Sequence, residues 1–146
     1  LSKALTGICN HHDILHSVFS DGQQRIRPSD GNALFELQEY NLTSEKDVDS
    51  AVQMCSKQMK QNMDLMHGPL VKAAICHTDD GDHLLLCISH LIADEFSLKI
   101  LKEDLLKAYL AASQNNDIHF SAKSASYGEW ISLLSEYGCG EEIEQE

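Results

Sequence analysis

The chain has 146 residues, of which 42% are hydrophobic and 6% aromatic, enough to build the core of one compact domain. Asp and Glu number 23 against 11 Lys and Arg, and the formal net charge of −12 argues against binding to nucleic acid or to an anionic membrane. No apolar run reaches the roughly 20 residues that cross a bilayer, and the first residues carry no signal-peptide pattern. The chain does not begin with Met, so we expect it to be part of a longer protein.

Cysteine usage indicates a reducing compartment. The five cysteines are an odd number, form no CxxC pair, and lie mostly inside apolar patterns: Cys9, Cys55, Cys76, Cys87 and Cys139. We interpret them as reduced core residues of a cytoplasmic protein.

The first third of the chain predicts a helix followed by a hairpin. Residues 2–15 have helical apolar spacing, and the predicted face consists of Ala4, Leu5, Ile8, Cys9, His12 and Leu15. Residues 16–27 favour a hairpin, because Asp21 and Gly22 supply the chemistry of a two-residue turn. Residues 28–31 predict another turn, and residues 33–42 predict a strand.

The middle of the chain predicts a helix followed by two strands. Ser44 and Asp47 stand three residues apart, as in a capping box, and the helical spacing that follows comprises Val48, Val52, Cys55 and Met59. Gly68-Pro69 ends this unit. Residues 70–78 and 83–92 are apolar runs joined by Asp79–Asp82, which predicts a hairpin whose strands are covered on both faces.

The last third predicts two helices separated by a polar loop. A long helix is indicated by Leu98, Leu101, Leu105 and Tyr109, and a short one by residues 126–138. Helices and strands therefore alternate, which favours an α/β or α+β two-layer class with mixed strand directions.

A histidine and an aspartate stand where the second apolar strand gives way to the long helix. Neutral imidazole accepts a proton near pH 7, so His90 at a strand end is suited to proton transfer, and Asp94 could orient the ring or brace the loop. Ser89 could donate a hydrogen bond, although it has no nucleophile-elbow context. The structural alternative is that Asp94 simply caps the helix and that a backbone carbonyl satisfies His90.

The remaining histidines do not indicate a metal centre. His12 and His16 are four residues apart and could chelate an ion if one helix ran through both, but nothing nearby in the sequence completes a site. We therefore expect no metal and no directly bound cofactor.

Three segments in the same order resemble the condensation domains of nonribosomal peptide synthetases. SHLIADEFSLKILKEDLLKAY (89–109) resembles the HHxxxDG region, and ALTGICNHHDILHSVFSDGQQRI (4–26) is similar to the segment around RHExLRTxF. MDLMHGPLVKAAI (63–75) looks like FDLxxGPLxRAxL, and ASYGEWISLL (125–134) like the short helix that follows in the family. The resemblance covers most of the chain.

This resemblance implies a chloramphenicol-acetyltransferase-like lobe, a mixed sheet flanked by helices. Residues 1–138 would be a partial N-terminal lobe, and residues 139–146 an acidic tail or linker to a C-terminal lobe. The implied partners are that C-terminal lobe and peptidyl or acyl carrier protein domains, which bring the phosphopantetheine arm. By the same resemblance His90 matches the second motif histidine, at the acceptor amine, and Asp94 matches the structural aspartate that usually pairs with an arginine.

The chain also departs from the family pattern at the expected site. Ser89 replaces the first motif histidine, and Glu95 replaces a glycine that leaves room for substrate. The Glu95 charge is expected to favour the imidazolium form of His90 and so to weaken a general base. His11 and His16 stand where the family carries arginines, so that Asp94 lacks its usual partner unless His16 is protonated.

These observations leave three hypotheses. The first is a condensation domain that transfers an acyl or peptidyl group from a carrier thioester to a carrier-bound amine. The second is a degenerate, non-catalytic scaffold or docking domain of the same fold, and the third is an O-acyltransferase of the same superfamily. In each case the fragment alone is expected to be inactive.

Overall fold

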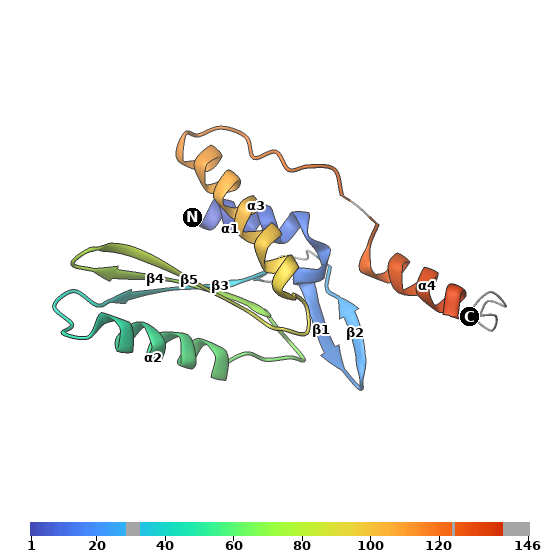
Figure 1. Ribbon diagram of the computed structural model, residues 1–146, viewed down its shortest axis with the longest axis horizontal. Helices are drawn as coiled ribbons and strands as arrows, with labels where there is room; N and C mark the ends of the chain where they lie inside the picture. The colour runs from blue at the N-terminus through green and yellow to red at the C-terminus, as the bar shows by residue number, and fades with distance from the viewer. Residues whose placement is uncertain (29–32, 124, 139–146) are drawn as a thin grey trace.

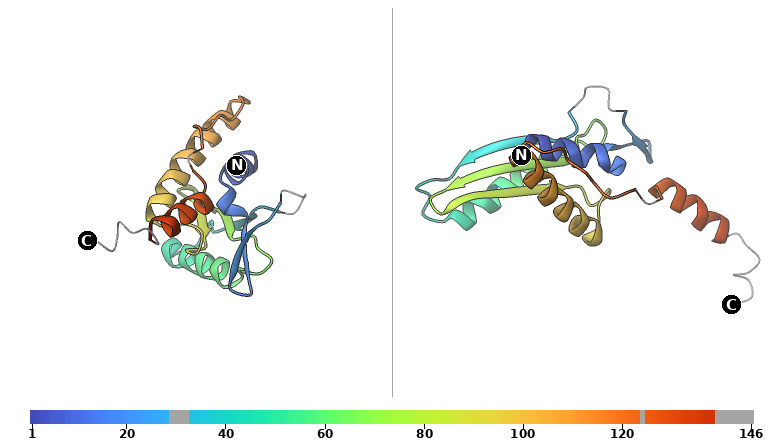
Figure 2. Two further views of the ribbon diagram at one scale, coloured as in Figure 1. Left: turned by 90° about the vertical axis from the view of Figure 1, so that its right-hand side faces the viewer. Right: turned by 90° about the horizontal axis from the view of Figure 1, so that it is seen from above.

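The computed structural model describes residues 1–28, 33–123 and 125–138, and within them a three-stranded sheet lies between helices. In chain order the elements are α1 (Ser2–His11), a 3₁₀ turn η1 (Asp13–His16), β1 (Ser17–Ser20), β2 (Gln23–Ile26), β3 (Glu36–Asn41), α2 (Val48–Gln61), β4 (Val71–Thr78), β5 (Gly81–Ile88), α3 (Glu95–Ser113) and α4 (Tyr127–Gly138). Figure 1 shows α2 on one face of the sheet and α1 with α3 on the other, and Figure 2 shows the same layers from two further sides.

The sheet has mixed strand directions, as the sequence predicts. β4 is central: it pairs in parallel with β3 and antiparallel with β5. Every residue of β4 is buried or half-buried, whereas β5 is an edge strand whose first four residues are exposed. The expectation that both strands are covered on both faces therefore holds for β4 and is wrong for the first half of β5.

Alternate residues of β4 face two different layers of core. Val71 and Ala73 pack with the buried side chains of α1 and α3, whereas Ala74 and Cys76 contact the layer under α2. The buried face of α1 is the predicted one: Ala4, Leu5, Ile8 and Cys9. Burying these side chains against the sheet supplies most of the free energy that holds α1 in place.

Helix ends differ from the predictions at two places. The helix predicted over 2–15 ends at His11, because the chain turns extended at His12 and continues as the short η1. The predicted capping box is also wrong. Asp47 caps α2 by accepting from the Ser50 amide at 3.0 Å, whereas Ser44 has a positive φ of 69° and its amide donates to Asp79.

The face of α3 is shifted from the predicted one. Its buried residues are Leu101, Leu105 and Ala108, and the predicted members Leu98 and Tyr109 are 43% and 47% exposed. The short helix α4 appears where the sequence predicts it, with no buried residue. The β1–β2 hairpin is confirmed, with positive φ at both turn residues, Asp21 and Gly22.

Some sequence predictions fall outside the described residues. These are most of the turn at 28–31, Cys139 and the acidic tail 139–146. The four described cysteines, Cys9, Cys55, Cys76 and Cys87, are free thiols and buried, as predicted. In the described ranges, no helix combines the length and the apolar character needed to cross a membrane.

Candidate active site at the end of β5

The loop between β5 and α3 begins at a strand that is held by its central neighbour. Ile88, the last residue of β5, pairs with Val71 in β4, and the Ser89 amide then donates to the Leu70 carbonyl at 3.1 Å. The Ile92 amide donates to the Ser89 carbonyl at 3.1 Å, which closes a tight turn. Ile92 and Ala93 are buried in the main core and anchor this turn. Two buried apolar residues thus fix the loop while its polar side chains stay accessible.

His90 projects from this anchored loop and is exposed. Its Nδ1 lies 2.7 Å from the backbone carbonyl oxygen of Ala93. Because a carbonyl oxygen only accepts, Nδ1 must carry the proton, and the neutral ring then has its lone pair on Nε2. The loop therefore orients an imidazole whose free nitrogen can accept a proton from a substrate.

Asp94 is the N-cap of α3. Its carboxylate accepts from the Ser97 amide at 2.8 Å and from the Ser97 hydroxyl at 2.6 Å. These two hydrogen bonds lower the pKa of Asp94, with a smaller contribution from the charge of His90. Within the described ranges Asp94 forms no ion pair, so its structural duty here is to start α3 directly after the His90 loop.

The other residues singled out by the sequence are arranged differently. His16 is buried, and its Nε2 has no hydrogen-bond partner among the described residues. No hydrogen bond or ion pair joins His16 to Asp94 in the described part of the chain, so the structure does not show it substituting for the family's arginine. Glu95 is exposed as the first residue of α3, and the Ser89 hydroxyl accepts only a long 3.4 Å contact from Leu91.

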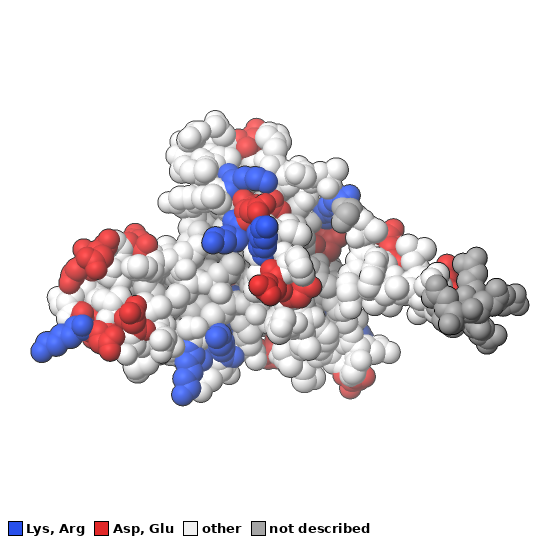
Figure 3. Space-filling view, viewed as in Figure 1, with Lys and Arg blue, Asp and Glu red and all other residues white. Residues whose placement is uncertain are grey.

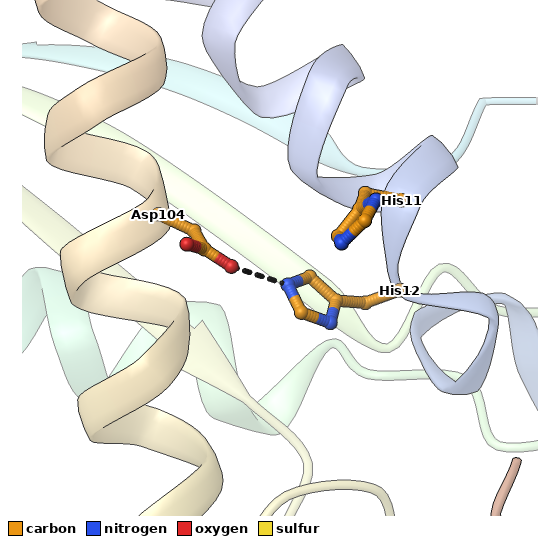
Figure 4. Close-up of side chains that lie close together, drawn as sticks. All are labelled: His11, His12 and Asp104. Carbon is orange, nitrogen blue, oxygen red and sulfur yellow. Dashed lines mark hydrogen bonds and ion pairs between the residues drawn. The ribbon is translucent and has the colours of Figure 1, made fainter. Parts of the chain in front are cut away.

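A second polar cluster, which the sequence analysis did not assemble, lies between α1 and α3. The His12 Nε2 and the Asp104 Oδ2 are 2.9 Å apart, and the ring of His11 lies beside them (Figure 4). His12 and His16 do not act as a pair, because α1 ends before His12. Asp104 could have been noticed from the sequence, since it interrupts the spacing Leu101, Leu105, Ala108 that faces α1.

Charges are distributed unevenly over the face drawn in Figure 3. Acidic side chains gather at the end of the sheet where β4 turns into β5, and red and blue side chains lie next to one another over α3. The turn supplies Asp79, Asp80 and Asp82. The acidic patch thus lies at the far end of β5 from His90, and it is unsuited to anionic partners.

Comparison with known proteins gives consistent results. The family described as "Condensation domain" matches residues 1–146. The chain is 36% identical over 140 residues to bacitracin synthase 3 of Bacillus licheniformis, a match that covers 94% of this chain and 2% of that protein. It is 34% identical over 140 residues to tyrocidine synthase 1 of Brevibacillus parabrevis, covering 94% of this chain and 13% of that protein.

Solved structures show the same fold. The epimerization domain from the third module of tyrocidine synthetase B superposes with a TM-score of 0.90 at 34% identity, covering 97% of this chain and 33% of that one. The starter condensation domain of rhizomide synthetase superposes with a TM-score of 0.74 at 18% identity, covering 99% of this chain and 35% of that one. The chain therefore spans about a third of the solved chains and a small part of the curated relatives.

Proposed function

Because the chain belongs to the condensation domain family of nonribosomal peptide synthetases, we propose that it is part of a domain that forms an amide bond between two carrier-bound substrates. The observation that carries this proposal is the His90–Ala93 hydrogen bond, which leaves Nε2 as the free proton acceptor at the end of β5. In the proposed step the acceptor amine attacks the donor thioester carbonyl. The C–N bond forms, the C–S bond breaks, Nε2 takes the amine proton, and the thiolate leaves on the donor carrier.

The substrates are proposed to arrive on partner domains. Peptidyl or acyl carrier domains would present each thioester on a phosphopantetheine arm, so the arm is part of the substrate. The buried free thiols support a cytoplasmic location, because such a compartment keeps cysteines reduced.

The proposed site is completed by a C-terminal lobe in the same domain. The solved relatives are about three times as long as this chain, which leaves room for that lobe. The helix α4 supports the proposal, since it exposes a row of large apolar side chains: Tyr127, Trp130, Ile131, Leu133, Leu134 and Tyr137. Figure 1 shows this helix projecting from the layered body. Exposed apolar area of this kind marks a surface that another part of a protein covers.

A second candidate is epimerisation of a carrier-bound aminoacyl or peptidyl thioester. It is favoured by the similarity to the tyrocidine synthetase epimerization domain, which has 34% identity and a TM-score of 0.90, against 18% and 0.74 for a starter condensation domain. In this reaction Nε2 of His90 would remove the Cα proton next to the thioester. A second proton donor would then return a proton to the opposite face, and no amide bond would form.

One experiment separates these candidates. The intact parent protein is incubated in D₂O with a carrier loaded with an L-aminoacyl or peptidyl thioester, with and without a loaded acceptor carrier. Peptide product that depends on the acceptor supports condensation. Incorporation of deuterium at Cα, together with a product of D configuration and without any acceptor carrier, supports epimerisation instead.

The remaining outcomes address the other hypotheses. An ester product with an alcohol acceptor would indicate an O-acyltransferase. No reaction with wild type, but activity in Glu95→Gly, would mean that the Glu95 side chain takes the room that the substrate needs. The absence of any reaction in both wild type and Glu95→Gly would indicate a scaffold domain and would overturn the catalytic proposal.

A further inference from the structure

The end of α1 and the middle of α3 bring three metal-binding side chains together. His11 is the last residue of α1, His12 follows it, and Asp104 lies on the facing side of α3. Their potential ligand atoms all lie within 4.8 Å of one another, and the closest pair is the His12 Nε2 and the Asp104 Oδ2 at 2.9 Å. Figure 4 shows both rings on the same side of the Asp104 carboxylate. We propose that His11, His12 and Asp104 bind a divalent transition-metal ion of the zinc type.

The donor set fits that class of ion. Two imidazole nitrogens and one carboxylate oxygen are ligands that Zn²⁺, Co²⁺ and Ni²⁺ accept, whereas Ca²⁺ and Mg²⁺ prefer oxygen alone. With metal–ligand bonds of about 2.1 Å, neighbouring ligand atoms around a tetrahedral ion are about 3.4 Å apart. The His12–Asp104 pair, at 2.9 Å, is already close to this separation, so forming the site requires mainly that the His11 ring moves toward this pair. A water molecule would take the fourth position.

Aromatic contacts position the His11 ring beside the His12 ring. The ring of His11 stacks on Phe120 with centroids 4.6 Å apart and an interplanar angle of 19°, and it meets the His12 ring edge-on at 4.8 Å. The side chains of His12 and Asp104 are 23% and 13% exposed, so the cluster is partly sheltered yet reachable from solvent. A stacked ring loses little conformational freedom when it ligates a metal.

The local charges are compatible with a cation. Two lysines, Lys123 and Lys107, carry the positive charges near the cluster. Lys123 is itself paired with Asp13 at 2.8 Å, and Lys107 stays 3.9 Å from the other oxygen of Asp104. Imidazoles that ligate a metal are neutral, so the Asp104 carboxylate supplies the negative charge of this ligand set.

The competing interpretation is a plain hydrogen-bonded pair that ties α1 to α3 and needs no ion. His11→Gln separates the two, because this substitution removes one ligand but leaves the His12–Asp104 bond of 2.9 Å in place. His77→Gln is the matched control, since His77 forms a similar 2.7 Å pair with Asp82 but is not part of a three-residue cluster in the described ranges. Asp104→Asn is informative as a second variant only if its circular dichroism matches that of wild type.

The test is a titration of the protein that contains this chain with Zn²⁺ by calorimetry and with Co²⁺ by visible absorption, each variant against wild type. We expect His11→Gln to lose one equivalent of binding or at least about tenfold in affinity, with an unchanged Tm in the absence of metal. His77→Gln should bind as wild type does. Equal affinity in His11→Gln and wild type, or a thiolate-to-cobalt charge-transfer band that reports cysteine ligation, would overturn the proposal. The readout is independent of catalysis, so its failure leaves the proposed function untouched.

Discussion

The Nδ1 of His90 donates to the carbonyl oxygen of Ala93 across 2.7 Å, so the loop that carries the imidazole also fixes which of its nitrogens is free. Ala93 is buried in the same core as α1, and its carbonyl is therefore held in position. A backbone acceptor, rather than a carboxylate, orients the ring. In a neutral ring this arrangement leaves Nε2 as the acceptor, and it places no charged partner on Nδ1.

Replacing His90 tests this arrangement directly. We expect His90→Ala in the intact parent protein to lower the rate of carrier-to-carrier transfer, or of Cα exchange, by about 10²–10⁴-fold, because a positioned proton acceptor contributes that much. The measurement is single-turnover product formation by mass spectrometry. His83→Ala is the control, because His83 lies exposed on β5, the strand that precedes the His90 loop. Equal rates for His90→Ala and wild type would contradict the assigned role.

The cap of α3 links stability to the position of His90. Asp94→Ala removes both hydrogen bonds to Ser97 and should lower Tm by a few degrees, together with the catalytic rate. Asp94→Asn keeps a capping oxygen and should lose less of both, measured by thermal unfolding and by transfer rate. If Asn were as damaging as Ala, the charge and not the cap would be the important property.

Asp47 caps α2 in the same way as Asp94 caps α3, but it is not part of the candidate active site. It accepts from Ser50 at the start of α2 in the same way, at 3.0 Å from the amide and 2.7 Å from the hydroxyl. Asp47→Ala should therefore lower Tm while the rate of transfer stays the same. A rate loss equal to that of Asp94→Ala would show that the effect at Asp94 is only one of global stability.

Acidic pH should remove the difference in unfolding free energy between wild type and Asp94→Asn. The pKa of Asp94 is lowered in the folded chain, chiefly by the Ser97 hydroxyl, so the folded chain binds a proton there less readily than the unfolded chain. Its contribution to stability is present above the unfolded pKa and is lost as the pH falls through the lowered folded pKa. Urea unfolding of both proteins at several acidic pH values measures this, and a gap that widens toward low pH would contradict it.

The sequence predicted the order of elements and the buried face of α1 because both follow from apolar periodicity. The predictions were wrong where tertiary contacts determine the structure. The helix stops at His11, whereas the apolar pattern runs on to Leu15, because η1 carries Leu15 into the core after a bend at His12. The role of Asp94 as a cap and the partner of the His90 ring were both anticipated as alternatives, since they are local contacts. The His12–Asp104 contact spans 92 residues, so the neighbours of each residue in the sequence do not indicate its partner, although Asp104 interrupts the apolar face of α3.

The sequence pattern also did not predict that a lysine is buried. Lys72 is the second residue of β4 and its side chain is 5% exposed. Its Nζ contacts the Glu36 carboxylate at 2.6 Å and the Asn62 carbonyl at 2.8 Å. Glu36→Gln leaves this charge less compensated, and we expect a loss of about 1 kcal/mol in unfolding free energy, since Glu36 is 39% exposed and solvent screens the pair. Lys72→Met removes the buried charge and should cost less, as measured by urea unfolding. A larger loss for Lys72→Met would show that packing of the lysine stem outweighs the charge.

The thiol of Cys9 should be unreactive in the folded protein. Burial in the core between α1 and the sheet raises the pKa of Cys9 to about 12, so almost no thiolate exists at pH 8. Iodoacetamide followed by peptide mass spectrometry should leave Cys9 unmodified in buffer and label it fully in concentrated guanidinium. Leu5→Ala, which opens a cavity in the same cluster, should destabilise the fold by about 2–5 kcal/mol and allow slow labelling of Cys9 through unfolding. Rapid labelling of Cys9 in native wild type would mean that α1 detaches from the sheet far more often than this packing implies.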